Sequence, residues 1–300
     1  MSSAQVAART IKNLEVEDWA VLEAIEKSIG SYESVPLKVI EKETSLHQDQ
    51  INFRLSRLNY FGFVMRTKFG YVLNTGGLDA LALNSFVKQN LISGMGSSIG
   101  MGKESDVFEV INDSGRESVI KFYRIGRTSF RSTRKNRAYV GTQDQHQWLE
   151  INIGAAQMEA NGLKKAKSAG VTVPDFIARD RHAVLMSEVD GPMLYRCTPE
   201  DIKKPKALLK EILLNLRISY TKADMINGDI SEFNILFDGD KPWIIDWPQF
   251  VSRSHANAAE MLHRDVDNAI SYFRRKFAID LETQKAVDYV TGKNSRLVIR

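Results

Sequence analysis

The spacing of hydrophobic residues predicts a small helical module at the start of the chain. Apolar residues recur every three or four positions over 19–29, and residues 47–61 repeat this pattern. A short helix between them would begin at Pro36, which suits a first helical turn. Residues 63–73 then read as two strands around a turn. Three helices followed by a hairpin predict a winged helix.

The third helix of a winged helix usually enters a major groove, so its exposed side chains suggest a partner. The side chains expected to face outward there and on the wing are His47, Gln48, Asn52, Arg54, Arg57, Arg66 and Lys68. Asp49, Glu41 and Glu43 dilute this positive charge. Contact with nucleic acid and docking on another protein therefore both stay open.

Composition sets broad limits on the kind of protein. The chain has 300 residues, of which 43% are hydrophobic and 26% charged, with a formal charge of +4, as in ordinary globular proteins. Cys197 is the only cysteine, so no disulfide can form within the chain, which fits a reducing cytoplasm. No apolar run approaches membrane-spanning length. We therefore expect a cytoplasmic protein without a membrane partner.

A glycine-rich stretch before a strand-like run is the first candidate for phosphate binding. Gly100 and Gly102 would let backbone amides approach phosphate oxygens without a side chain in the way. Lys103 and the hydroxyls of Ser98 and Ser105 would add to that cradle. A plain glycine-rich hairpin is the simpler alternative, and the spacing does not match a Walker loop.

Lys121 changes this balance because it lies within the apolar strand 118–123. A buried ammonium is costly unless it is paired. Glu159, on the inner side of a helix predicted over 148–168, is the candidate partner, although an ordinary solvated glutamate is the alternative. A later strand, 183–189, would form a hinge whose backbone near Met186 to Glu188 meets adenine.

Two carboxylates and a carboxamide follow a long helix predicted over 205–225. Asp229 and Asn234 stand in one loop, and Asp246 ends a strand-like run. Asn234 and Asp246 would supply oxygen ligands to Mg²⁺, and Asp229 would orient or deprotonate a nucleophile. A surface turn would produce the same short pattern by chance.

A basic segment with no acidic residue separates the two groups of candidates. We interpret it as a mobile loop that contacts RNA backbone or an acidic protein patch, and a solvated charge run is the alternative. Its cationic residues are Arg124, Arg127, Arg131, Arg134, Lys135 and Arg137.

The order of these parts is that of kinase-like phosphotransferases, and several blocks together resemble the RIO-type atypical kinases. The blocks are 100–108, 120–124 with 126–130, 228–234, 245–249, and 264–268 with 272–273. The winged helix is similar to that of the second RIO subfamily, and the lack of a long tail resembles archaeal members. Asn227, where the family usually has histidine, and Trp247, where phenylalanine is more frequent, are departures.

The resemblance implies an α+β fold with a winged helix-turn-helix domain packed on a truncated bilobal protein-kinase-like domain. The domains would be 1–85 for the winged helix, 86–91 for the end of a connecting helix, 92–189 for the N-lobe and 190–300 for the C-lobe.

The same resemblance implies a serine/threonine kinase or ATPase that uses ATP and Mg²⁺ and phosphorylates itself. Its role would be in maturation of the small ribosomal subunit, on a particle of ribosomal RNA and proteins. The residue equivalent to Asp246 would accept the phosphoryl group. Only 54 residues follow Asp246, which leaves little room for the activation loop of an ordinary protein kinase. Two alternatives are a small-molecule phosphotransferase of the aminoglycoside or choline kinase kind, and a non-enzymatic winged-helix adaptor.

Overall fold

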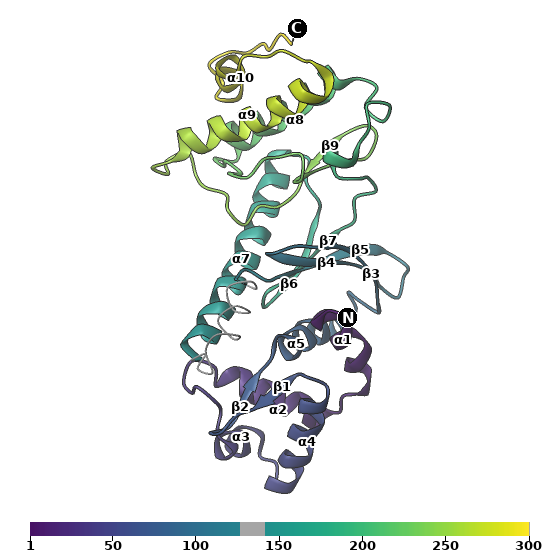
Figure 1. Ribbon diagram of the computed structural model, residues 1–300, viewed down its shortest axis with the longest axis vertical. Coiled ribbons are helices and arrows are strands. Elements are labelled where there is room, and N and C mark those ends of the chain that lie inside the picture. Colours follow the sequence, from purple (N-terminus) through teal and green to yellow (C-terminus); the bar gives the residue numbers. More distant parts are fainter. Residues whose placement is uncertain (127–141, 300) are drawn as a thin grey trace. The chain divides into compact units, whose positions relative to one another are not determined.

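The computed structural model describes residues 1–126 and 142–299, without the side chains of 142–146 (Figure 1). The chain forms two units, one of residues 1–156 with 178–185 and one of residues 157–177 with 186–300. The winged helix and most of the predicted N-lobe therefore share the first unit.

The first unit begins with the predicted winged helix, and its three helices and hairpin are confirmed. One further helix at the N-terminus, followed by a single 3₁₀ turn at Ile11–Asn13, was not predicted. The elements are α1 (Ser3–Thr10), α2 (Val16–Lys27), α3 (Leu37–Thr44), α4 (Gln48–Tyr60), β1 (Val64–Arg66), β2 (Tyr71–Leu73) and α5 (Thr75–Lys88). Ile25, Ile51 and Leu55 are buried in its core.

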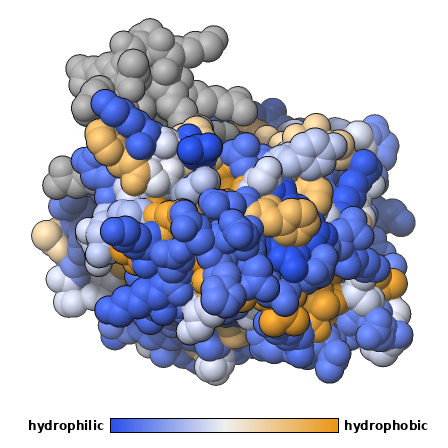
Figure 2. Space-filling view, turned by 90° about the horizontal axis from the view of Figure 1, so that it is seen from below, coloured by the Kyte–Doolittle hydropathy of each residue, from blue (hydrophilic) through white to orange (hydrophobic). Residues whose placement is uncertain are grey.

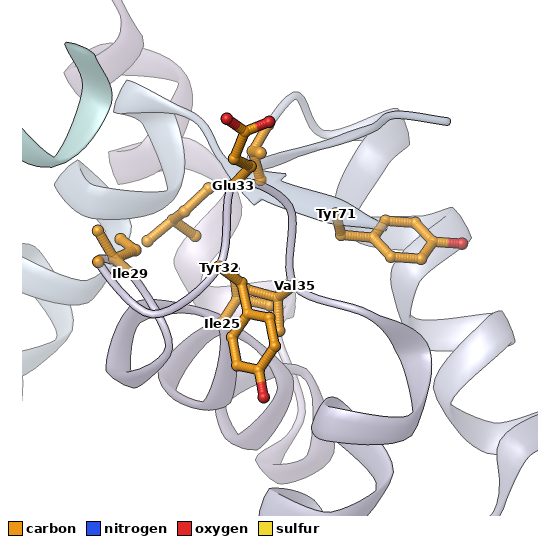
Figure 3. A pocket seen from close by; sticks show the side chains of 9 residues that line it. Ile25, Ile29, Tyr32, Glu33, Val35 and Tyr71 are labelled. Atoms are coloured by element: carbon orange, nitrogen blue, oxygen red, sulfur yellow. The ribbon is translucent and has the colours of Figure 1, made fainter. Parts of the chain in front are cut away.

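The wing packs tightly against the segment between α2 and α3. Val35 and Tyr71 exchange two backbone hydrogen bonds of 2.8 and 3.0 Å. A Cβ atom at Gly70 would lie 2.3 Å from the carbonyl oxygen of Val35, so only glycine fits there. The cavity beside this contact, between Ile25, Tyr32 and Val35, measures about 10 Å³ (Figure 3). That is the space of about one water molecule, which excludes an organic ligand.

The prediction that Arg54 and Arg57 belong to an exposed basic face of the third helix is wrong. The side chains of Arg54 and Arg57 are only 13% and 21% exposed. Both reach the start of α2, where Arg54 contacts Glu15 at 2.9 Å and Arg57 contacts Asp18 at 3.0 Å. The acidic first turn of α2 therefore neutralises them.

The exposed side of α4 keeps polar and aromatic residues instead. Phe53 and Tyr60 lie seven residues apart on one face, and both are exposed. Figure 2, seen from below in the view of Figure 1, shows mainly hydrophilic residues with hydrophobic ones in smaller groups. A partner that binds this side of α4 would therefore contact polar and aromatic side chains, and not a predominantly basic surface.

A five-stranded sheet follows in the order β3-β4-β5-β7-β6. Its first three strands are antiparallel neighbours, as the predicted glycine-rich hairpin and lysine strand require. The strands are β3 (Gly94–Met101), β4 (Ser105–Ile111), β5 (Glu117–Tyr123), β6 (Phe176–Asp180) and β7 (Ala183–Ser187). Phe108, Ile120 and Phe122 are buried in the sheet.

Arg124 does not belong to an exposed loop, and its predicted contact with RNA is wrong. The side chain is buried directly after β5, where it pairs with Asp79 of α5 at 2.8 Å and Asp106 of β4 at 3.1 Å. His182 Nε2 lies 2.9 Å from both Arg124 Nη1 and Asp79 Oδ1. We call these four residues the Arg124 cluster. The other predicted residues of the basic segment (Arg127, Arg131, Arg134, Lys135 and Arg137) lie outside the described part of the chain.

The Arg124 cluster joins the winged helix to the sheet within the first unit. Burial alone would raise the pKa of Asp79, but the guanidinium of Arg124 and the hydrogen bond with His182 hold it below its usual value. Burial lowers the pKa of His182. A second link pairs Arg181 with both oxygens of Glu26, at 2.5 and 2.6 Å.

The second unit is mainly helical, and the helices predicted over 148–168 and 205–225 are confirmed. Helix α8 contacts both α9 and α10. Buried apolar residues of these helices include Leu209 and Ile212 of α8 and Phe273 of α9. The elements are the end of α7 (Thr142–Ala169), α8 (Pro205–Lys222), β8 (Ile235–Phe237), β9 (Pro242–Ile244), α9 (Ala258–Phe277) and α10 (Thr283–Val290). Helix α10 was not predicted. None of the described helices has the length and apolar character that crossing a bilayer requires.

Candidate active site

The loop between α8 and β8 brings Asp229 and Asn234 into direct contact. The amide nitrogen of Asn234 donates to the backbone carbonyl of Asp229 at 2.8 Å and to its carboxylate at 2.9 Å. Because the nitrogen is used in this way, the amide oxygen of Asn234 faces away from Asp229. The predicted grouping of these two residues is thus present within the second unit.

Asn227 brings the third predicted residue, Asp246, to the same place. Its buried side chain donates to the carbonyl of Asp246 at 2.9 Å and accepts from the backbone N–H of Asp229 at 3.0 Å. An amide supplies both the donor and the acceptor that these two contacts need. The departure at Asn227 therefore preserves the packing of the loop.

The backbone of Asp246 is held in an unusual conformation. Its φ of 68° lies in the left-handed region, which is uncommon for residues other than glycine. Such strain persists only where the surroundings impose it, and it concentrates at functional sites. Here the carbonyl is held by Asn227, and the next residue, Trp247, is fully buried and donates its backbone N–H to Glu159 at 2.6 Å.

Glu159 therefore supports the strand end that carries Asp246. A Cβ atom at Gly162, one turn further along α7, would lie 2.6 Å from Cβ of Trp247, so the helix approaches this segment closely. Trp247 also satisfies its indole N–H on the carbonyl of Ile244, as expected of a tolerated aromatic replacement. Pairing of Glu159 with Lys121 stays a prediction, since the two residues belong to different units.

Helix α9 fixes the loop from its other side, through residues to which the sequence assigned no role. Asp265 accepts the N–H groups of Gly228 and Ile230 at 2.7 and 3.1 Å, on either side of Asp229. Asn268 donates to the carbonyl of Ile230 at 3.0 Å. The signal was present in the block 264–268, but nothing in its spacing indicates contact with a loop 35 residues earlier.

Burial shapes the acid–base properties of this loop. It raises the pKa of Asp229, with a smaller raising effect from the charge of Asp246 and an opposing effect from the Asn234 hydrogen bond. Burial also raises the pKa of Asp265 to about 6, although the two backbone N–H groups oppose this. A raised pKa brings a carboxylate closer to the range in which it can accept a proton during catalysis.

We expect activity to fall as the pH drops through about 6 while the fold stays intact. Below that pH Asp265 takes up a proton and loses acceptor capacity toward the loop. By linkage, a carboxyl whose pKa is raised by folding makes the folded state more stable as pH falls through this window. ATP turnover and the thermal midpoint should therefore diverge when both are followed from about pH 5 to 8.

Asp265→Asn supplies the control for this pH dependence. The variant should be less active at neutral pH. Its activity should also no longer show the part of the fall below about pH 6 that protonation of Asp265 causes. If the activity of Asp265→Asn fell with the same midpoint and steepness at acid pH, the fall would be assigned to another group, such as Asp229.

The nucleotide-facing candidates of the first unit lie on β3, β4 and β5. Lys121 is 7% exposed, opposite Val107 in the β4–β5 pair, with its amine 4.8 Å from the Tyr123 ring centre. Its predicted burial is confirmed. Ser98 and Gly100 lie on β3, Ser105 opens β4, and Gly102 and Lys103 form the turn between them.

Packing does not require glycine at position 100 on β3 or at position 102 in the turn. A Cβ at Gly100 would have no neighbour within 4 Å, and one at Gly102 would meet only ordinary contacts. Neither glycine has a positive φ. The open space beside the backbone therefore fits the predicted approach of a phosphate group. Of the predicted hinge residues, Met186 is buried in β7 and Glu188 is exposed just after it.

The donor chemistry of the loop fits Mg²⁺ bound together with a phosphate. Asn234 and Asp246 offer the hard oxygen ligands that this ion prefers. Across the described residues, no group of three or more His, Cys, Asp or Glu side chains forms a metal cage. Mg²⁺ commonly takes one or two protein carboxylates and completes its shell with water and substrate phosphates.

Comparison with known proteins decides the family. A model of the RIO domain matches residues 106–286, and a model of the Rio2 N-terminal domain matches residues 11–89. The chain belongs to the Rio2 family of serine/threonine kinases. Because the chain belongs to this family, the two alternatives, a small-molecule phosphotransferase and a non-enzymatic winged-helix adaptor, are set aside.

Individual Rio2 proteins are similar along nearly the whole chain. The RIO-type kinase Rio2 of Methanocaldococcus jannaschii is 38% identical over 85% of this chain and 94% of its own length. The rio2 kinase of Schizosaccharomyces pombe is 32% identical over 90% of this chain and 79% of its own. A crystal structure of the Rio2 kinase from Chaetomium thermophilum, an ADP/Mg²⁺-phosphoaspartate complex, matches with a TM-score of 0.79 and 30% identity, covering 96% and 93% of the two chains. The α+β Rio2 fold is confirmed.

Proposed function

We propose that the principal phosphoryl acceptor of this Mg²⁺- and ATP-dependent atypical serine/threonine kinase is its own Asp246. The observation that supports this most directly is the loop in which Asn227 holds the backbone of Asp229 and of Asp246 at once. The phosphoaspartate of the Chaetomium Rio2 complex supports the same acceptor chemistry.

The reaction would proceed in two steps. An oxygen of Asp246 attacks the γ-phosphorus of ATP, the bond to the β-phosphate bridging oxygen breaks, and ADP leaves. Water then attacks the aspartyl phosphate, Asp229 accepts the water proton, and phosphate and the Asp246 carboxylate are regenerated. Bound Mg²⁺ would neutralise phosphate charge, with Asn234 and Asp246 as its protein ligands.

Residues of the first unit would hold the triphosphate. Lys121 is placed to neutralise phosphate charge, and the backbone at Gly100 and Gly102 gives room for close approach. Met186 and Glu188, around the end of β7, would meet the adenine through their backbone groups. These assignments extend the geometry of each unit to an adenine nucleotide such as the ADP of the Chaetomium Rio2 complex.

We propose further that the protein acts in the cytoplasm on a precursor of the small ribosomal subunit, with ribosomal RNA and proteins as partners. The winged helix and the cations of residues 127–137 would provide contacts, and autophosphorylation at Asp246 would act as a switch more than as a route to a peptide product.

Single-turnover hydrolysis of γ-labelled ATP, with and without purified small-subunit particles, tests this function. We expect phosphate release to be stimulated by the particles and the protein to acquire label that hydroxylamine removes, as an acyl phosphate requires. Absence of turnover under both conditions would contradict the enzymatic proposal. Turnover without any response to the particles would contradict only the ribosomal role.

A further inference from the structure

A hollow of about 330 Å³ opens beside the catalytic loop on the surface of the second unit. Tyr195, Glu232, Tyr272, Arg275 and Lys276 line it. Glu232 belongs to the loop itself, three residues after Asp229. The volume reaches the lower end of the range of small-ligand pockets, so a planar group of nucleobase size fits.

Tyr195, which lines this hollow, forms an exposed pair of aromatic rings with Phe233. The rings of Tyr195 and Phe233 lie 4.9 Å apart, and the two residues are 38% and 56% exposed. The guanidinium of Arg196 lies 5.4 Å from the centre of the Tyr195 ring and donates to its hydroxyl at 2.8 Å. Exposed rings beside arginine are the arrangement on which unpaired bases stack.

The floor of the hollow holds its cations in place. Arg275 pairs with Glu232 at 2.8 Å, and Lys276 donates to the backbone carbonyl of Cys197. Tyr272 is buried, and its hydroxyl donates to the carbonyl of Leu194 at 2.7 Å. Each cation has donors to spare after these contacts, since a guanidinium carries five N–H groups and an ammonium three.

Four exposed lysines lie between Cys197 and the second turn of α8, in the segment that follows Tyr195 and Arg196 along the chain. They are Lys203, Lys204, Lys206 and Lys210. The first turn of α8 has no acidic residue, so Lys204 and Lys206 lie at the positive end of the helix dipole, which disfavours them. No acid within the described residues pairs with any of the four, whereas Lys167 and Lys285 elsewhere do find acidic partners.

The acidic residues nearby do not cancel this charge. Glu232 is already paired with Arg275, and Asp201, although exposed, accepts from the backbone and hydroxyl of Thr198. Glu200 and Glu211 are exposed. Seven cations in this region therefore face four carboxylates, two of which are engaged.

We propose that this basic–aromatic surface, formed by Tyr195, Arg196, Phe233, Arg275, Lys276 and the four lysines, binds single-stranded RNA. A base would stack on the Tyr195–Phe233 edge and enter the hollow, while the lysines bind successive phosphates. An acidic peptide would satisfy the lysines but would leave the two rings unused, so RNA is the better fit. The inference rests on the proposed ribosomal role for its natural ligand, but its test involves neither ATP nor turnover.

Fluorescence anisotropy of the full chain with a labelled oligouridine of about 12 nucleotides measures the binding, without nucleotide and between about 50 and 200 mM KCl. Replacing the four lysines by glutamine should weaken binding at least about tenfold and reduce the slope of log affinity against log salt by about 3, or roughly 0.7 for each phosphate that is no longer neutralised. Tyr195→Leu should weaken binding about 5- to 150-fold at unchanged slope, and Tyr195→Phe should retain it.

The matched control replaces four exposed lysines elsewhere with glutamine. These are Lys88, Lys165, Lys222 and Lys241. They change the net charge equally, so an equal loss of affinity in this variant would overturn the proposal. Crosslinking of 4-thiouridine RNA should label the peptides that contain Tyr195 or Phe233, and labelling confined to other segments would also overturn it.

A second probe separates RNA from an acidic protein. An oligoglutamate peptide of about 12 residues should bind more weakly than the RNA and be indifferent to Tyr195→Leu. Equal binding of both probes, with no effect of Tyr195→Leu on either, would show an acidic-protein site and refute the RNA assignment. The ATP assays above are unaffected by either result.

Discussion

Asp246→Asn should abolish both labelling of the protein by γ-labelled ATP and release of phosphate, by at least about 10³-fold, the order lost when one charged catalytic group is removed. The amide can neither attack phosphorus as a carboxylate does nor carry the charge that Mg²⁺ favours. The fold should persist, because the contact of this residue with Asn227 is made by its backbone carbonyl.

Asp229→Asn separates the two steps of the proposed reaction. Attack by the Asp246 carboxylate releases no proton, so formation of the aspartyl phosphate does not need Asp229 as a base. Hydrolysis does need a proton acceptor, and the raised pKa of Asp229 suits that role. The labelled protein should therefore accumulate in Asp229→Asn and be absent in Asp246→Asn.

Asp240→Asn, at an exposed position after β8, is the matched control and should behave as the parent protein. Stable labelling of Asp246→Asn would place the acceptor on another residue. Loss of labelling in Asp229→Asn together with normal ATP binding would instead assign Asp229 to the first step.

The sequence was sufficient where a function depends on neighbours along the chain. Asp229 and Asn234 were predicted to act together, and the loop that holds them five positions apart places them in contact. The strand that buries Lys121 was predicted correctly from the apolar residues on either side of it. Local patterns of this kind follow from backbone geometry and need no knowledge of distant segments.

The sequence was insufficient where a charge is matched by a distant partner. Arg54 and Arg57 have no acid on their own helix face, yet the start of α2, some 40 residues earlier, neutralises both. Asp265 is part of a recognisable block, but only the fold shows that it holds the backbone around Asp229. The short helices α1 and α10, with eight residues each, depend on tertiary packing more than on their own pattern.

Arg124→Met should destabilise the first unit by about 3–5 kcal/mol, the usual result of removing one partner from a buried charge network. Asp79 and Asp106 are both fully buried, and each would lose its guanidinium. At about 2–4 °C for each kcal/mol in a unit of this size, the thermal midpoint should fall by roughly 6–20 °C. Urea unfolding followed by fluorescence and calorimetry measures both quantities.

Two further variants test whether the loss of stability in Arg124→Met comes from breaking the buried charge network. Arg253→Met removes a pair of similar length, 2.7 Å to Asp224, that is about half exposed, and it should change stability much less. Removing the acids as well, in Arg124→Met with Asp79→Leu and Asp106→Leu, should restore part of the loss, because apolar groups can replace a complete buried ion cluster. Equal effects of Arg124→Met and Arg253→Met would mean that Arg124 is not what fastens the winged helix to the sheet. Since Arg124 lies three residues after Lys121, the cluster also fixes the end of the strand from which Lys121 would reach the nucleotide.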